Sequence, residues 1–328
     1  MKFEKVRWGI IGCGDVTEVK SGPALQKIGN SELVAVMRRT GVLAKDYAER
    51  HDVPKWYDDA DALINDPDVD AVYIATPPSS HKEYTIEVAK AGKPVYVEKP
   101  MALNFTECSE MIAACNAAGV PLYVAYYRRA LPRFLKVKEL LENKAVGDVR
   151  FVSTKLYQKA SDNVLDSKNL PWRVQPEIAG GGLFFDLASH TLDLFDFLFG
   201  PIKDVQGFAS NQAGYYRAED IVTGTYRFES GVHGIGSWCF TAFDDVDVNE
   251  IVGSKGKISF STFGNEPIVL KTTSGTEQWR FEAPLHVHQP LLETIVADLL
   301  EGSSQCSSIG VTAARTNWVM GKINGWSL

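Results

Sequence analysis

The residues with the most direct chemical meaning lie in a glycine-containing turn near the start of the chain. Residues 12–17 read Gly-Cys-Gly-Asp-Val-Thr, after an apolar run and at the start of a helical pattern. Gly12 and Gly14 allow a tight turn and let the backbone approach a pyrophosphate at a helix N-terminus. The third small position of this dinucleotide fingerprint is a threonine here. The pattern predicts a nicotinamide dinucleotide site with Gly12, Gly14, Asp15 and Val16 as cofactor contacts, the alternative being an ordinary strand-to-helix turn.

The end of the next apolar run indicates which nicotinamide cofactor is preferred. NAD-dependent enzymes usually place Asp or Glu there, to accept hydrogen bonds from the ribose 2′-hydroxyl. This chain has Arg38 and Arg39 instead. Two guanidinium groups can pair with a 2′-phosphate, which a carboxylate would repel. The sequence therefore predicts NADP, with NAD less favoured and two solvated arginines as the alternative.

A candidate for proton transfer follows another apolar run. Glu98 and Lys99 come directly after residues 94–97, at what would be the carboxyl edge of a sheet, where open α/β sheets bind ligands. Hydride transfer between a carbinol and a nicotinamide ring needs a proton donor or acceptor at the substrate oxygen. A partly buried lysine can serve, because burial brings its pKa towards the working pH. Lys99 is thus a candidate catalytic residue, the alternative being a surface lysine.

A carboxylate and an imidazole form a second candidate pair. Asp186 and His190 lie four residues apart, after the glycine run 180–182. On a helix they share one face, where the carboxylate can orient the imidazole or stabilise its charge. Both are candidate catalytic residues, although such a pair on a helix surface is common and often has no function.

Histidine and cysteine spacing argues against a metal site. His286 and His288 could ligate zinc, but no third ligand is apparent, so none is expected. The five cysteines are odd in number and form no CxxC motif. Disulfide and zinc frameworks are therefore not expected, and a cytoplasmic location is predicted.

Composition places the chain among ordinary globular proteins. It has 328 residues, of which 45% are hydrophobic and 23% charged, and a net charge of −7 without a basic block. A nucleic-acid partner is not expected, because phosphates require clustered Lys and Arg. No apolar run approaches the roughly 18 residues of a membrane span, and the N-terminal residues lack the apolar segment of a secretory signal. The length favours two domains.

The elements that must position these residues change in character along the chain. Up to residue 125, apolar runs at 6–11, 33–37, 69–75, 94–97 and 120–125 alternate with helical patterns at 42–51, 81–91 and 106–118. Strands separated by helices imply crossover connections and a parallel sheet buried on both faces. Residues 1–125 are therefore predicted to form a doubly wound, dinucleotide-binding Rossmann domain.

The remaining residues, 126–328, show a different pattern of predicted helices and strands. A helix is predicted at 184–199, followed by strands at 202–210, 221–228, 232–241, 246–252, 257–261 and 268–272, and by helices near 289–300 and 311–323. Successive strands with short turns predict an open, mostly antiparallel sheet in a substrate-binding α+β domain. The fold class is thus α/β plus α+β. One uncovered sheet face would favour a homo-oligomer, a dimer or tetramer.

Four motifs in this order resemble the glucose–fructose oxidoreductase/inositol dehydrogenase/rhizopine-catabolism (Gfo/Idh/MocA) family over nearly the whole chain. They are the glycine turn, Ala75-Thr-Pro-Pro-Ser-Ser-His81, Val97-Glu-Lys-Pro-Met101 and the segment from Gly180 to Asp193. Trp172-Arg173 looks closest to the 1,5-anhydrofructose reductase and dihydrodiol dehydrogenase branches.

The resemblance implies roles that spacing alone does not. Lys99, Asp186 and His190 match residues that line the reacting carbon, with Lys99 or His190 as the acid–base. Cofactor contacts are implied for a further group of residues: Thr76, Pro77, His81, Glu98, Lys99, Trp172 and Arg173. Asp193 could cap a helix or bind a ligand. His288 could approach the cofactor where relatives carry a tyrosine, and Tyr126-Tyr127 departs from the branch pattern, which leaves substrate preference open.

Three functions remain open on this basis. The first is an NADP-dependent oxidoreductase that exchanges a hydride with a sugar, polyol or related small carbonyl compound. The second is a non-catalytic NADP-sensing regulator on the same fold, because fold alone does not imply catalysis. The third is a dehydrogenase of an aromatic trans-dihydrodiol. The intact set of Lys99, Asp186 and His190 favours an enzyme over a sensor.

Overall fold

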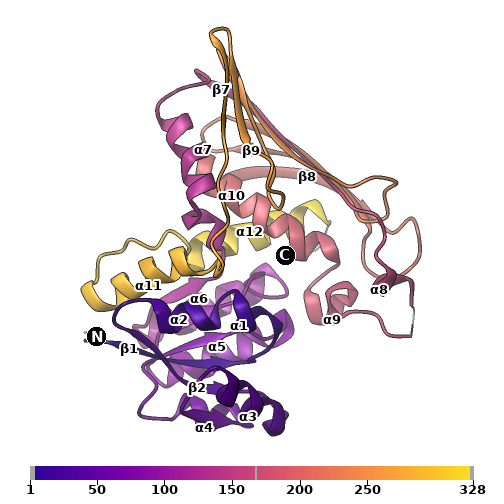
Figure 1. Ribbon diagram of the computed structural model, residues 1–328. Coiled ribbons are helices and arrows are strands. Elements are labelled where there is room, and N and C mark those ends of the chain that lie inside the picture. Colours follow the sequence, from indigo (N-terminus) through magenta and orange to yellow (C-terminus); the bar gives the residue numbers. More distant parts are fainter. Residues whose placement is uncertain (1–3, 167, 326–328) are drawn as a thin grey trace. The chain divides into compact units, whose positions relative to one another are not determined.

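The computed structural model describes residues 4–166 and 168–325, and it divides the chain into two compact units (Figure 1). The first unit comprises residues up to Ala102, Thr106–Tyr127 and Ala283–Ala314. The second comprises Leu103–Phe105, Arg128–Glu282 and the residues from Arg315 onward. The predicted domain division between residues 125 and 126 stays a prediction.

The first unit is built on a parallel sheet of six strands in the order β3-β2-β1-β4-β5-β6. This is the order of a dinucleotide-binding Rossmann sheet, and it confirms the predicted fold class. The inner strands are buried along almost their whole length because helices cover both faces. The strands are β1 (Val6–Ile11), β2 (Ser31–Met37), β3 (Lys55–Tyr57), β4 (Ala71–Ile74), β5 (Val95–Val97) and β6 (Leu122–Val124).

Helices follow the strands of this sheet, and one of them comes from far along the chain. They are α1 (Asp15–Val19), α2 (Gly22–Lys27), α3 (Gly41–Arg50), α4 (Ala60–Ile64), η1 (Pro78–Ser80), α5 (His81–Lys90) and α6 (Phe105–Ala118). The short helix η2 (Tyr127–Ala130) lies in the second unit except for its first residue. Helix α11 (Gln289–Glu301) packs against α2 and β1 (Figure 1). Residues 283–314 thus complete a unit whose other residues lie before residue 128.

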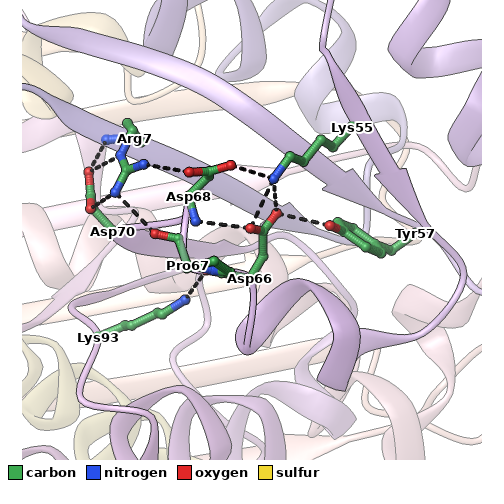
Figure 2. A network of polar contacts seen from close by, with 8 residues as sticks. All are labelled: Arg7, Lys55, Tyr57, Asp66, Pro67, Asp68, Asp70 and Lys93. Atoms are coloured by element: carbon green, nitrogen blue, oxygen red, sulfur yellow. Dashed lines mark hydrogen bonds and ion pairs between the residues drawn. The ribbon is translucent and has the colours of Figure 1, made fainter.

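A network of charged side chains ties the amino ends of the strands together (Figure 2). Arg7 on β1 donates to both carboxylate oxygens of Asp70, at 2.9 and 2.8 Å, and to Asp68 at 3.0 Å. Lys55, the first residue of β3, donates to Asp66 and Asp68. The network therefore fixes the loop before β4 to β1 and β3, at the sheet edge opposite the predicted site residues.

The second unit is built on an eight-stranded sheet in the order β14-β13-β12-β11-β7-β10-β9-β8. Only β7 and β10 pair in parallel, so the sheet is mostly antiparallel, as predicted. The strands are β7 (Val149–Tyr157), β8 (Ile202–Ser210), β9 (Ile221–Phe228), β10 (His233–Cys239), β11 (Val246–Gly253), β12 (Gly256–Phe260), β13 (Ile268–Thr272) and β14 (Gly275–Trp279).

Helices of this unit cover one face of the sheet, and the other face is exposed. The helical elements are α7 (Pro132–Glu142), α8 (Asp162–Leu165), η3 (Trp172–Val174), α9 (Pro176–Ala179), η4 (Phe184–Ala188), α10 (Ser189–Phe199) and α12 (Gly310–Ile323). Gly207 and Gly224 let Ile323 of α12 approach the sheet, because a Cβ atom at either glycine would lie 2.8–3.2 Å from that side chain. On β9, residues alternate between buried and exposed, so the face away from the helices is bare.

Several elements differ from the sequence-based expectation. Strands β3 and β14 and helices α2, α4 and α7 lie outside the predicted ranges. Strand β7 was not predicted, although it lies near the centre of the sheet between β10 and β11. The predicted helix at 184–199 begins with a π-helical turn, η4, before α10 continues as an α-helix. Such turns are rare and often occur at functional sites. In the part of the chain described, no helix is long and apolar enough to cross a membrane.

Candidate functional site

The predicted cofactor turn is held against the ends of two strands. The backbone N–H groups of Gly12 and Cys13 donate to the carbonyl oxygen of Met37, at 2.8 and 3.2 Å. Gly12 has a φ of +92°, and a Cβ atom there would lie 2.7 Å from Thr76. Glycine is therefore required at this position both by the left-handed backbone and by the close approach of Thr76.

The backbone at Gly14 is open to the approach of a ligand. A Cβ atom on Gly14 would meet only the carbonyl oxygen of Gly12, at 3.9 Å, so the position is open. The fully buried Thr17 accepts a hydrogen bond from the Gly14 N–H at 2.9 Å and donates to its carbonyl oxygen at 2.8 Å. Asp15 is exposed and Val16 partly buried at the start of α1. Thr17 thus fixes the turn through these two bonds, and the position beside Gly14 stays open.

Arg38 and Arg39 lie directly after β2, beside this turn. Both side chains are exposed, and the Arg38 N–H donates to the carbonyl oxygen of Tyr57 at 3.2 Å. This bond fixes the backbone at the end of β2. The two guanidinium groups are available to an anionic group of a ligand that reaches this edge of the sheet.

His81 joins two of the predicted cofactor segments. It is fully buried, and its Nε2 lies 2.7 Å from the carbonyl oxygen of Thr76. Its Nδ1 lies 3.1 and 3.2 Å from the carbonyl oxygens of Pro100 and Met101. Burial lowers the pKa of this imidazole. The contacts hold the turn after β4, with the partly buried Pro77, beside the turn after β5. A cofactor contact of His81 itself stays a prediction.

Glu98 and Lys99 occupy the turn after β5. Glu98 is buried and accepts hydrogen bonds from the Tyr73 hydroxyl at 2.6 Å and from the Lys99 backbone N–H at 3.1 Å. Burial raises the pKa of the Glu98 carboxyl, and the positive charge of Lys99 opposes that rise. Glu98 therefore fixes the backbone of the predicted catalytic lysine, and the two side chains interact electrostatically.

In the second unit, the triple glycine allows very close packing at the start of η4. A Cβ atom on Gly180 would lie 2.7 Å from the carbonyl oxygen of Leu103, and one on Gly181 would lie 2.2 Å from the Phe185 ring. The Gly182 N–H donates to the carboxylate of Glu219 at 2.9 Å. Glycine is therefore required on steric grounds before the segment that carries Asp186 and His190.

Asp186 forms an ion pair that the sequence did not predict. Arg173 Nε lies 3.2 Å from an Asp186 carboxylate oxygen, and the Arg173 guanidinium also lies over the ring of the partly buried Trp172. Asp186 belongs to η4, whereas Trp172 and Arg173 belong to η3. The structure thus joins a predicted cofactor residue to a predicted catalytic residue.

His190 lies one residue into α10, in a largely aromatic and polar environment. Its side chain is buried, and the Phe263 ring meets the imidazole edge-on, with ring centroids 5.7 Å apart. The Arg128 guanidinium lies over the same phenylalanine, 4.6 Å from its centroid. Asp247 accepts the backbone N–H groups of residues 262–264 and so holds the Phe263 loop. Sequence reasoning missed Phe263, because no motif marks this loop.

Asp193 has a clear structural contact. It accepts two hydrogen bonds from Arg129, at 2.8 and 2.7 Å, and both side chains are almost fully buried. Asp196 lies 3.3 Å from Arg129 and is also bonded to Arg315 of α12. Asp193 and Asp196 therefore tie α10 to η2 and α12 through buried ion pairs.

Other sequence-based candidates can be placed as follows. His286 and His288 precede α11 in the first unit, and both are buried. Tyr126 is buried, and the Tyr127 ring stacks on His288 with centroids 4.6 Å apart. Among the described residues no three His, Cys, Asp or Glu side chains are grouped so as to hold a metal ion.

Comparison with known proteins identifies relatives along the whole chain. The chain is 41% identical to "Oxidoreductase P35" of Formosa agariphila, over 95% of this chain and 97% of that protein. It is 27% identical to 1,5-anhydro-D-fructose reductase of Ensifer adhaerens, over 93% and 91% of the two chains. It is 32% identical to trans-1,2-dihydrobenzene-1,2-diol dehydrogenase of Bos taurus, over 70% and 66%. These relatives match the branches that the Trp172-Arg173 motif suggested.

The solved structures agree with this assignment. Aldose-aldose oxidoreductase from Caulobacter crescentus, in complex with glycerol, superposes with a TM-score of 0.85 at 26% identity, over 97% of this chain and 96% of that one. Residues 6–126 match the model described as "Oxidoreductase family, NAD-binding Rossmann fold", and residues 134–259 match the GFO/IDH/MocA C-terminal domain. The chain therefore belongs to the Gfo/Idh/MocA family and is an NAD(P)-dependent oxidoreductase.

Proposed function

We propose that this protein is an NADP-dependent oxidoreductase that exchanges a hydride with a sugar, polyol or related small carbonyl compound. The observation that carries the cofactor preference is the pair of exposed arginines, Arg38 and Arg39, directly after β2. An acidic residue in this place would accept hydrogen bonds from a ribose 2′-hydroxyl. Two guanidinium groups instead attract a 2′-phosphate.

Most of the residues that we propose as cofactor contacts belong to the first unit. The open position beside Gly14 and the tight turn at Gly12 suit a pyrophosphate, and the cofactor would supply or accept the hydride. Thr76 borders the same turn, and the proposed cofactor set also includes Asp15, Val16, Pro77 and His81. Contacts from Glu98, Lys99, Trp172 and Arg173 complete the proposed cofactor set.

Lys99 and His190 handle the proton in this proposal. The carbinol or carbonyl oxygen gains or loses a proton as the hydride moves, so a donor or acceptor must be held at that oxygen. Lys99 is held at the backbone by Glu98, and His190 is buried beside Phe263. Asp186 acts through His190 as a positioning residue.

The names of the relatives limit the class of substrate that we propose. Their names refer to an anhydro-sugar, an aromatic dihydrodiol and aldoses. All three classes present a carbinol or a carbonyl carbon next to further oxygens. A small oxygenated compound of this kind is the proposed substrate, and the similarity to dihydrodiol dehydrogenase favours an aromatic trans-dihydrodiol as the second candidate.

We further propose a cytoplasmic homo-oligomer that assembles through the bare face of the second sheet. All five cysteines are free thiols, which supports a reducing compartment. Four large apolar side chains are exposed on that face, and such surface favours association between copies. They are Phe151, Phe208, Ile235 and Val248.

The test of the proposed function is a panel of sugars, polyols and trans-dihydrodiols with NADP(H) and NAD(H), read at the nicotinamide absorbance. We expect turnover with NADPH and tighter binding of NADPH than of NADH. Arg38→Ala should weaken NADPH binding by about 1–3 kcal/mol, because one charge-assisted contact is lost, and leave NADH binding nearly unchanged.

Lys45→Ala is the matched control, because Lys45 is an exposed cation on α3 in the same unit. Equal wild-type affinity for both cofactors would contradict the NADP assignment. Tight NADPH binding without turnover of any compound would instead favour the sensing regulator.

A further inference from the structure

A buried group of polar side chains lies behind the Glu98-Lys99 turn. It comprises Tyr73, Tyr96 and Glu98 from β4, β5 and the following turn, and His288 from the segment before α11. His288 is 1% exposed and Glu98 is 7% exposed, and both tyrosines are fully buried. No step of the proposed mechanism uses His288, and the His-x-His motif to which it belongs has no assigned role.

The contacts of His288 lead from Tyr96 to Glu98. Its Nδ1 lies 2.9 Å from the Tyr96 hydroxyl, and its Nε2 lies 3.7 Å from Oε1 of Glu98. The same Oε1 accepts the Tyr73 hydroxyl at 2.6 Å. The His288 backbone is fixed as well, because its N–H donates to the carbonyl oxygen of Lys20 at 3.2 Å. The imidazole is thus held between a phenol and a carboxylate.

The contact between Tyr96 and Nδ1 allows either tautomer of the imidazole, and the tautomer in which Tyr96 donates places the ring proton opposite Glu98. Burial raises the pKa of Tyr96 well above its usual value, so the phenol keeps its proton. A phenol that donates to Nδ1 leaves the ring proton on Nε2. In this tautomer Nε2 presents an N–H group towards Oε1 of Glu98, 3.7 Å away, and this group favours the charged carboxylate.

The Glu98 carboxylate transmits this effect to Lys99. Its second oxygen, Oε2, accepts the Lys99 backbone N–H at 3.1 Å, and the two side chains interact electrostatically. A neutral carboxylic acid would bind that N–H more weakly and would no longer attract the ammonium group. The state of Glu98 therefore affects both the position and the charge environment of Lys99.

We propose that His288 is a positioning residue for the hydride-transfer reaction, which keeps Glu98 charged and so holds Lys99 in its working position. This inference rests on the proposed function, because it assigns a task to Lys99 in that reaction. It adds a residue from far along the chain, which the cofactor and catalytic motifs do not include.

The titratable groups that face this cluster are few among the described residues. Tyr96 and Tyr73 face it from the sheet, and the Tyr127 ring stacks on His288 from η2. Lys99 and Lys20 act on Glu98 by their positive charge, and Cys306 acts on Tyr96. Burial raises the pKa of the Glu98 carboxyl, so Glu98 takes up a proton at a higher pH than an exposed glutamate does.

The kinetic test compares His288→Asn with His288→Gln. Asparagine can place an amide near the Nδ1 position and leaves the Nε2 position empty, whereas the longer glutamine can place an amide group near Nε2. We expect His288→Asn to lower kcat about tenfold and to leave the KM for NADPH within twofold. His288→Gln should recover most of the loss.

The pH profile provides the readout that a structural role would not move. Removing the Nε2 donor raises the pKa of Glu98 further, so its carboxylate is lost at a higher pH. The acid limb of the kcat/KM profile should therefore shift to higher pH in His288→Asn. His286→Asn is the matched control, because His286 is also buried in this segment but contacts Val19 and Lys27. It should leave the profile unchanged.

A second measurement does not depend on turnover. Nitrogen-15 spectra of the imidazoles, with His288 assigned by comparison with His288→Asn, should show a proton on Nε2 of the wild-type residue. A bare Nε2 with the proton on Nδ1 would overturn the inference, as would an unshifted acid limb or a full kcat in His288→Asn. Failure of the wild type to turn over any compound would refute the proposed function, and the proton position would still test His288.

Discussion

The side chains proposed for proton transfer differ in how their surroundings hold them. The backbone N–H of Lys99 donates to the Glu98 carboxylate at 3.1 Å. His190 is buried on a helix beside the Phe263 ring. Spacing predicted the first of these placements, because a residue after a buried parallel strand lies at the carboxyl edge.

Spacing could not predict the partners of these residues. Arg173 meets Asp186 from another helical segment, and Phe263 reaches His190 from a loop more than 70 residues later. Contacts between distant segments depend on how the sheet places its loops, and no local pattern records that.

Replacing either proposed proton-transfer residue should abolish most of the turnover. We expect Lys99→Ala and His190→Ala each to lower kcat about 10²- to 10⁴-fold, the range of general acid–base catalysis, with little change in NADPH affinity. Steady-state kinetics and fluorescence titration of the cofactor measure the two effects. Lys90→Ala and His233→Ala are controls, since both residues are exposed on other elements. A loss below tenfold in both test variants would contradict the assignment.

Asp186 should act through His190. Asp186→Asn keeps the shape and removes the charge, so the imidazolium is less favoured and the His-linked limb of the pH–rate profile should move to lower pH. The double variant with His190→Ala should be little worse than His190→Ala alone, because residues that act as a unit are not additive. Measured kcat/KM values for the four proteins decide this. Losses that multiply would show an independent role for Asp186, for instance through Arg173.

At the scale of elements, α10 depends on charges that are buried with it. Arg129 is 3% exposed and bonds to Asp193 and Asp196 of this helix, and Asp196 also bonds to Arg315. Burial raises the pKa of Asp193 to about 6, and Arg129 opposes the rise. The helix that carries His190 is therefore fixed by a buried ion network.

Arg129→Gln should destabilise the protein by about 3–5 kcal/mol, because it leaves two buried carboxylates with one fewer cation. Arg227→Gln is the matched control, since that arginine is half-exposed and its pair with Asp204 should contribute about 0–1 kcal/mol. Denaturant unfolding measures both values.

The pH dependence of the same variant has a definite sign. A folded-state pKa above the unfolded value means that the folded state binds more protons, so stability falls as pH rises from about 4 to about 6 in the wild type. Loss of Arg129 raises the Asp193 pKa further, and the fall should extend to higher pH. The difference between wild type and Arg129→Gln should thus grow above pH 6. A constant difference would contradict the buried ion network.

Most elements of the first unit could be predicted, because buried parallel strands are short apolar runs bounded by glycine. Strand β7 was missed for a physical reason. It reads Val-Arg-Phe-Val-Ser-Thr-Lys-Leu-Tyr, with charged residues on its exposed face, and its partners β10 and β11 come about 80 residues or more later. The π-helical turn was missed because the sequence-based prediction treated residues 184–199 as one regular helix.

For the whole molecule, two compact units with different sheets account for both family matches. The number and type of sheets were predictable, because strands alternate with helices early in the chain and follow one another directly later in it. The place of residues 283–314 in the first unit was not predictable. Helix α11 has the pattern of an ordinary amphipathic helix, and that pattern does not indicate which elements it packs against.

The exposed sheet face should control the oligomeric state. Phe208 on β8 is 84% exposed, and Phe208→Asp should shift the wild-type oligomer towards monomer, because burying a carboxylate in an interface is unfavourable. Phe243→Asp is the control, since Phe243 is 89% exposed but lies in the loop between β10 and β11. Sedimentation velocity distinguishes the species. A monomeric wild type, or equal behaviour of the two variants, would contradict assembly through this face.

The return of residues 283–314 to the first unit has a consequence for biosynthesis. Chains are made from the N-terminus, and N-terminal domains usually fold first. Here β1 to β6 emerge before the second unit is made, but α11, which packs on α2 and β1, emerges only after residues 128–282. A nascent chain therefore carries an uncovered surface on α2 and β1 while residues 128–282 are made, and the first unit is completed only after them.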